Sequence, residues 1–196
     1  MITNTIDVGM DEYYFTNKKD AVLVTKGITT CIAFVVQGHY YDEDANFIPF
    51  CGLFHWSGFT DPRNQATDYV AEQLQFFFEE LREQLDIEED DKIIVTSLLF
   101  IGGEKSQFEG RELILSGTEK EVETLKEVAS GFNYEEFNIM LKSRPVHNHY
   151  LTSGELSLAV EVGINQFGLS YEHLADEEEI EDGDLESFDL KALTRS

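Results

Sequence analysis

The amino-acid sequence predicts an α+β protein, in which layered β-sandwich or mixed sheets are flanked by two main helices. Several short apolar runs are rich in Val, Ile and Phe and are bounded by glycines or acidic turns, as buried strands are. Two other segments repeat apolar residues at steps of three and four, which is the spacing of one helix face. The 196 residues are enough for one domain with a sizeable core.

A β-hairpin is the clearest predicted element. The continuous apolar run 31–41 is followed by an acidic turn, and the chain returns through 47–56. A buried strand is also expected at 92–101, ended by Gly102 and Gly103. Further strands are expected at 21–25, 112–115, 137–141, 146–151, 156–162 and 165–171.

Two helices are expected between these strands. Residues 66–85 carry one apolar stripe along their length. Thr118 and Glu121 have the spacing of a capping box, which predicts a helix that begins there and stops at Gly131.

The chain divides by composition into three parts. Residues 1–20 are polar with scattered aromatics and are expected to be an irregular lead-in, and 21–171 form the single domain. Residues 172–196 are expected to be a disordered acidic tail, because ten of the 18 residues from 172 to 189 are Asp or Glu. Two interpretations of the tail stay open, a solubilising end or a glutamate-rich signal like those of type IV secretion effectors.

Charge restricts the partners of this chain. With 39 acidic and 14 basic residues, its net charge is −25. Binding to nucleic acid or to anionic lipid is therefore not expected, whereas a basic protein partner is permitted. The sequence also has no long apolar stretch, no secretory signal pattern and only two cysteines. We expect a cytoplasmic protein, or one exported without an N-terminal signal.

The residues that suggest chemistry are Cys31 and His55. If the hairpin turns near 43–44, residue 31 lies opposite a residue near 55, with Cβ atoms about 5 Å apart. An imidazolium beside a thiol favours the thiolate, which is the nucleophile, and the same His can shuttle a proton. The alternative is that Cys31 is a buried structural residue, as free cysteines commonly are.

Other candidates are weaker. His147 and His149 are spaced to share one strand face, which makes them a candidate metal pair, but no third ligand is identifiable. Cys51 is expected to be a small buried apolar residue. We therefore expect no metal and no cofactor.

The order of these elements resembles a known family. Thr25, Cys31 five intervening residues later, and His55 on the next strand are similar to the pattern of the glutamine deamidase fold. That fold is shared by the chemoreceptor deamidase CheD and by toxins of the cytotoxic necrotizing factor type. The helix 66–85, the strand ending in Phe100-Ile101-Gly102-Gly103, a second helix and Gly-rich strands follow in the family's order. The resemblance covers roughly 21–171.

The resemblance implies a cysteine-dependent deamidation of a glutamine side chain on a protein substrate. Cys31 would be the nucleophile, His55 the general acid and base, and Thr25 the residue that fixes the tautomer of the His. Backbone N–H groups around Thr29 and Thr30 would hold the oxyanion. The chain departs from the family pattern where Thr29 and Thr30 replace Gly-Ser, and where Ile101 is inserted.

Two other functions stay open. One is a catalytically inactive adaptor of the same fold that binds a basic protein through its acidic surface. The other is a related cysteine hydrolase, such as a protease or a transglutaminase-like enzyme. Residues 1–20, 57–65 and 103–111 are the expected rim of the site.

Overall fold

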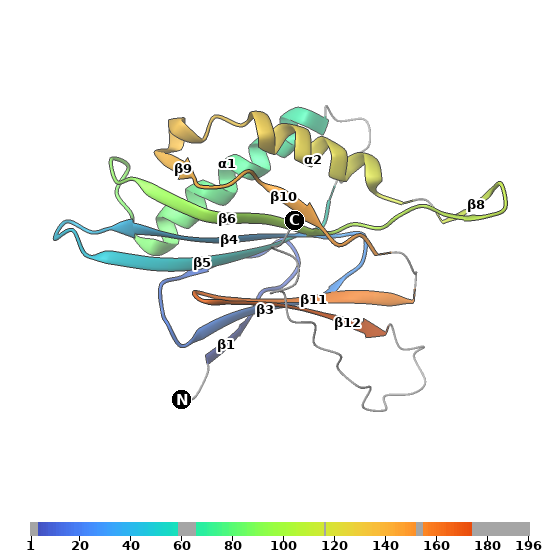
Figure 1. Ribbon diagram of the computed structural model, residues 1–196, viewed down its shortest axis with the longest axis horizontal. Coiled ribbons are helices and arrows are strands. Elements are labelled where there is room, and N and C mark those ends of the chain that lie inside the picture. The colour runs from blue at the N-terminus through green and yellow to red at the C-terminus, as the bar shows by residue number, and fades with distance from the viewer. Residues whose placement is uncertain (1–3, 59–65, 116, 152–154, 174–196) are drawn as a thin grey trace.

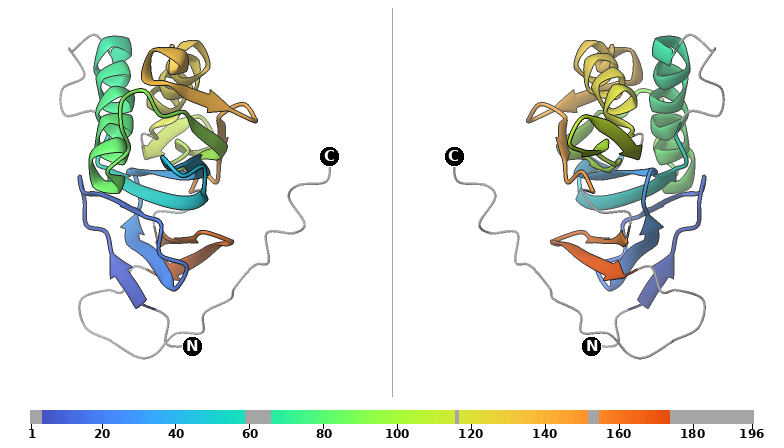
Figure 2. Two further views of the ribbon diagram at one scale, coloured as in Figure 1. Left: turned by 90° about the vertical axis from the view of Figure 1, so that its left-hand side faces the viewer. Right: turned by 90° about the vertical axis from the view of Figure 1, so that its right-hand side faces the viewer.

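The computed structural model describes residues 4–58, 66–115, 117–151 and 155–173. Within these ranges two β-sheets stack on one another, and two α-helices cover the outer face of the larger sheet (Figure 1). Figure 2 shows the same layers from the side, with α1 and α2 next to each other above the sheets. The predicted α+β class, with mixed sheets and two helices, is confirmed.

The larger sheet has the strand order β10-β6-β4-β5-β2, and β9 pairs with a second stretch of β6. Strands β4 and β5 are the predicted hairpin, and β6 pairs antiparallel with the other edge of β4. The bounds are β2 Tyr13–Thr16, β4 Ile32–Tyr41, β5 Phe47–Trp56, β6 Ile93–Gly102, β9 Ile139–Leu141 and β10 Val146–Asn148.

The smaller sheet has the order β1-β3-β11-β12. Its bounds are β1 Asn4–Asp7, β3 Ala21–Ile28, β11 Leu156–Gly163 and β12 Gln166–His173. Because β3 and β4 follow each other in the chain but lie in different sheets, residues 29–31 connect the two layers. A separate two-stranded hairpin is formed by β7 Gln107–Glu109 and β8 Glu112–Leu115.

The helices are α1, Ala66–Leu85, and α2, Glu119–Gly131, followed by the short 3-10 helix η1, Tyr134–Phe137. Both predicted α-helices are confirmed, but the predicted capping box is wrong. Thr118 makes no side-chain cap hydrogen bond, because its Oγ1 accepts the backbone N–H of Glu104 instead (2.8 Å). None of the described helices is long and apolar enough to cross a membrane.

The core has two parts, one on each face of the larger sheet. Along β4, Ile32, Phe34 and Val36 face the helices, whereas Ala33 and Val35 face the smaller sheet. The alternation follows from the period of two in a strand. Both faces of β4 are covered, which is why residues 31–36 are apolar without interruption.

Two predicted boundaries are corrected. Residues 1–20 are not wholly an irregular lead-in, because β1 pairs parallel with β3 and β2 pairs antiparallel with β5. Glu172 and His173 belong to β12 rather than to a tail. The rest of the predicted tail, 174–196, lies outside the described residues.

Candidate active site

A hydrogen bond between the two sheets joins Thr25 to His55. Thr25 lies on β3 of the smaller sheet and His55 on β5 of the larger sheet, and their side chains are 2 % and 3 % exposed. Thr25 Oγ1 is 2.7 Å from His55 Nδ1. The pairing that the sequence suggested is therefore present, and it is buried between the layers.

The second ring nitrogen of His55 is available for chemistry. His55 Nε2 is buried, and the described residues supply it with no hydrogen-bond partner. When Nδ1–H donates to Thr25 Oγ1, the lone pair of Nε2 is left to accept a proton. Nε2 is a base only in that tautomer, because a Thr25 O–H that donates to Nδ1 leaves the ring proton on Nε2 instead.

Cys31 lies in the same layer, in the connection from β3 to β4. It packs in the apolar cluster between the sheets together with Ala33 and is 7 % exposed. The sequence predicted that residue 31 lies opposite a residue near 55, and the observed register differs from a 31–55 pair by two residues. The Cα partner of His55 is Ala33, two residues further on. A shift of two preserves the face, so Cys31, Ala33 and His55 stay on the inner side of the sheet.

Gly102 and Gly103 hold the backbone of the Cys31 connection. Gly103 N–H donates to the carbonyl of Cys31 (2.9 Å). Gly102 has a φ of +112°, and a Cβ placed on it would lie 2.5 Å from that same carbonyl oxygen. Only glycine allows both the conformation and the approach. The Gly-Gly pair at the end of β6 is therefore part of the site's framework.

The two predicted oxyanion residues, Thr29 and Thr30, lie in different environments. Thr29 is half-buried. Burial raises the pKa of the Cys31 thiol, and backbone N–H groups of Cys31 and then of Thr29 offset part of that rise. Thr30 is exposed in the adjacent bend. A backbone N–H aimed at the sulfur also suits an anion that forms beside it.

The protonation of the pair differs from the sequence-based expectation. Burial, and then the nearby Asp11, raise the pKa of Cys31, and burial lowers the pKa of His55. Both shifts favour a neutral thiol and a neutral imidazole, rather than the thiolate and imidazolium that we expected. The cause is that the space between the sheets excludes water.

Asp11 is the residue that sequence reasoning missed. Its N–H donates to the carbonyl of His55 (2.6 Å), and its carboxylate accepts the N–H of Ser57 (2.9 Å). It has a φ of 59°. Its charge adds to the rise in the pKa of Cys31 and opposes the fall in the pKa of His55 that burial causes. No local signal pointed to this role, because residues 11 and 55 are joined only by the tertiary fold.

The other sequence candidates have structural roles. Cys51 is fully buried, and burial raises its pKa to about 12. His147 Nε2 lies 2.8 Å from the carbonyl oxygen of Gly102. His149 follows the end of β10 with a φ of 61°, so the two histidines do not share a strand face as expected. Within the described ranges no three potential ligands gather into a metal site.

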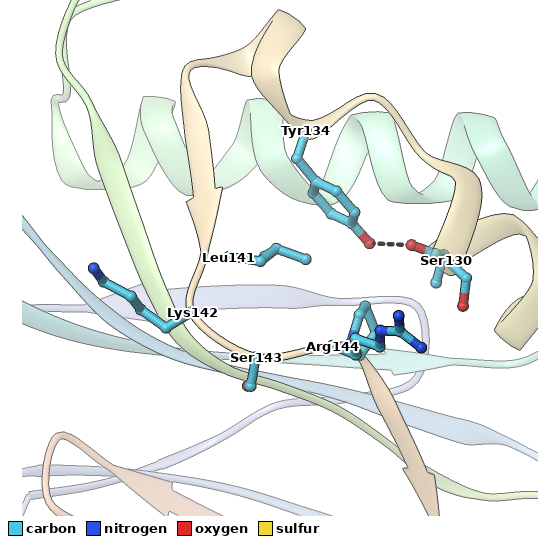
Figure 3. A pocket seen from close by; sticks show the side chains of 8 residues that line it. Ser130, Tyr134, Leu141, Lys142, Ser143 and Arg144 are labelled. Atoms are coloured by element: carbon cyan, nitrogen blue, oxygen red, sulfur yellow. Dashed lines mark hydrogen bonds between the residues drawn. The ribbon is translucent and has the colours of Figure 1, made fainter.

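A cavity of about 550 Å³ lies in the helix layer, away from Cys31. Figure 3 shows it between the end of α2 and the chain after β9. Tyr134 O–H donates to the carbonyl of Ala129 (2.7 Å), and Lys142 extends away from Arg144. Because the two basic side chains diverge, they do not form a clamp for an anion.

The comparisons add no relatives to this description. No protein-family model and no curated protein matches the chain. The chemistry of the site therefore follows from its own residues. These are a thiol, an imidazole with one nitrogen held, and a backbone N–H group, in one buried layer.

Proposed function

We propose that this protein hydrolyses the side-chain amide of a glutamine on a protein substrate, with Cys31 as the nucleophile. The observation that carries the proposal is the 2.7 Å hydrogen bond between Thr25 Oγ1 and His55 Nδ1, with Cys31 in the apolar cluster between the same two sheets. A histidine held this way presents Nε2 as a base. The order of the elements supports the proposal by its resemblance to the CheD-like deamidase fold.

The proposed reaction has two stages. His55 Nε2 takes the thiol proton as the sulfur of Cys31 attacks the amide carbon, and the N–H of Thr29 stabilises the oxyanion. His55 then gives that proton to the leaving nitrogen, which departs as ammonia and leaves a thioester. Water attacks the thioester carbon while His55 removes its proton. The proton returns to the sulfur as the product glutamate leaves.

The neutral resting pair fits this sequence of steps. Proton transfer from thiol to imidazole accompanies attack, so the ion pair is needed only as substrate arrives. Substrate bound at Cys31 keeps water from the developing charges, which strengthens their stabilisation by the surrounding dipoles.

The test is amide hydrolysis without chain cleavage. The full chain is incubated with a glutamine-containing dipeptide and with core histones, and ammonia release and intact mass are followed. Wild type should release ammonia and convert amide to acid in both probes, whereas Cys31→Ser should not. Peptide cleavage by the wild type would favour a protease. Equal ammonia release by Cys31→Ser would refute the proposal.

A second candidate is the inactive adaptor that binds a basic partner. The observation that favours it is the direction of both pKa shifts, which leave Cys31 without resting thiolate. For an adaptor, Cys31→Ser should bind a basic protein as wild type does, and affinity should fall as salt rises. Binding that is insensitive to ionic strength would count against it.

A further inference from the structure

The β7–β8 hairpin projects from the end of the molecule where β6 reaches the candidate site. Figure 1 shows it extending well beyond the sheets and helices. It pairs with no other described strand. The residues between Gly103, which bonds to Cys31, and the first residue of β7 are 104–106. The hairpin and the site are therefore linked by a very short segment.

The hairpin carries large apolar side chains that the fold does not cover. Phe108, Leu113 and Ile114 are 61 %, 52 % and 62 % exposed. Phe108 and Leu113 are cross-strand partners, and Ile114 is the extra residue of a bulge beside them. Bulges re-aim side chains. A cluster of exposed apolar side chains on a projecting element is typical of a binding surface rather than of a solvated loop.

The base of the hairpin is fixed rather than free. Ser106 N–H and Oγ–H both donate to the carboxylate of Glu119 (2.6 and 3.0 Å), and Gly117 N–H donates to Ser106 Oγ (3.0 Å). Thr118 and Glu104 exchange two further hydrogen bonds at 2.8 Å. The hairpin is thus held at a set position against the start of α2.

Charge indicates what the hairpin binds. At its tip Glu109 and Glu112 are direct cross-strand partners, and Arg111 lies in the turn between them. Like charges that face each other across two strands cost stability. Glu109, Arg111 and Glu112 together carry a formal charge of −1, so a partner carrying Lys or Arg would complement the tip. A second copy of this chain would not, because each copy carries a net charge of −25.

We propose that the β7–β8 hairpin is the docking arm for the protein substrate. The partner surface is an apolar patch bordered by basic residues, and it places a glutamine at Cys31. This inference rests on the proposed function. It adds that specificity comes from a contact outside the site. Changes in the arm should therefore lower the reaction rate on a protein substrate but not the rate on a small amide.

The first experiment separates docking from chemistry by rate. The arm variant is Phe108→Ser with Leu113→Ser and Ile114→Ser, and the matched control is Phe76→Ser, an exposed aromatic (48 %) on α1. The probes are the glutamine dipeptide and core histones. The arm variant should act on the dipeptide within about twofold of wild type and lose about tenfold or more in kcat/KM on histones. The control should change neither rate.

The second experiment measures binding alone. Full chains carrying Cys31→Ser, with and without the arm substitutions, are titrated with core histones at about 0.15 M salt. The dissociation constant should rise about tenfold or more with the arm substitutions and stay unchanged with Phe76→Ser. Absent binding, or equal binding by both chains, would overturn the docking arm. Arm-dependent binding without any Cys31-dependent ammonia release would instead overturn the proposed reaction and leave the arm standing.

Discussion

Replacing Thr25 by Val tests the link between the two sheets most directly. Val fills nearly the same volume but has no hydroxyl, so His55 Nδ1 loses its partner while staying buried. Nε2 already has no partner among the described residues. A buried polar atom that loses its hydrogen bond costs about 1–3 kcal/mol. We therefore expect Thr25→Val to lower the free energy of unfolding by about 2 kcal/mol.

The matched control is Thr25→Ser, which keeps the hydroxyl and removes one methyl group. Loss of one buried methyl costs about 1 kcal/mol, so this variant should be the more stable of the two. Urea unfolding at constant slope measures both values. The chemistry should separate them further, because Ser keeps a hydroxyl that can bond to His55 Nδ1 and Val does not. If Thr25→Ser is the less stable variant, or if Thr25→Val matches wild type, the inter-sheet hydrogen bond does not stabilise the fold.

Three further predictions follow from the same site. Cys31 should be alkylated by iodoacetamide only at a pH above the ordinary thiol range, because burial and then Asp11 raise its pKa. Asp11→Asn should move this pH profile of alkylation to lower pH, and an unchanged profile would contradict the role of Asp11. Because the pKa of His55 is lowered from 6.5, the unfolded state binds more protons below that pH, so stability should rise with pH up to about 6.5 and then level off. His55→Gln should flatten that rise in pH-dependent urea unfolding, and an equal slope in both proteins would refute it. Gly102→Ala should lower the free energy of unfolding at least twice as much as Gly110→Ala, because both glycines have positive φ but only Gly102 would place a Cβ against Cys31. For Gly110→Ala we expect a loss of about 1 kcal/mol. Thermal unfolding measures both losses.

Regular, locally encoded features were predictable from the sequence. The helix 66–85 and the hairpin of 31–41 with 47–56 were expected within a residue of their bounds. Their signals are long and periodic, and their partners are near in the chain. The Thr25–His55 hydrogen bond was expected from the resemblance to the deamidase fold and not from a local pattern.

Features that depend on distant partners were not predictable. Strands β1 and β2 are four residues each, and their pairing with β3 and β5 carries no local signature. Thr118 has a capping-box spacing, but Glu104, 14 residues earlier, takes its hydroxyl. The neutral state of Cys31 and His55 results from burial between sheets, which no spacing within one hairpin reveals.

Because the connection between β3 and β4 is short, the reactivity of Cys31 reports how stably the two sheets pack against each other. Residues 29–31 span from one layer to the other, so they have no slack to absorb a separation of the layers. Any opening between the sheets must move the thiol and break the Thr25–His55 bond in the same event. The rate at which a thiol reagent reaches Cys31 in mild denaturant therefore reports the free energy of that opening, in a protein that is otherwise folded.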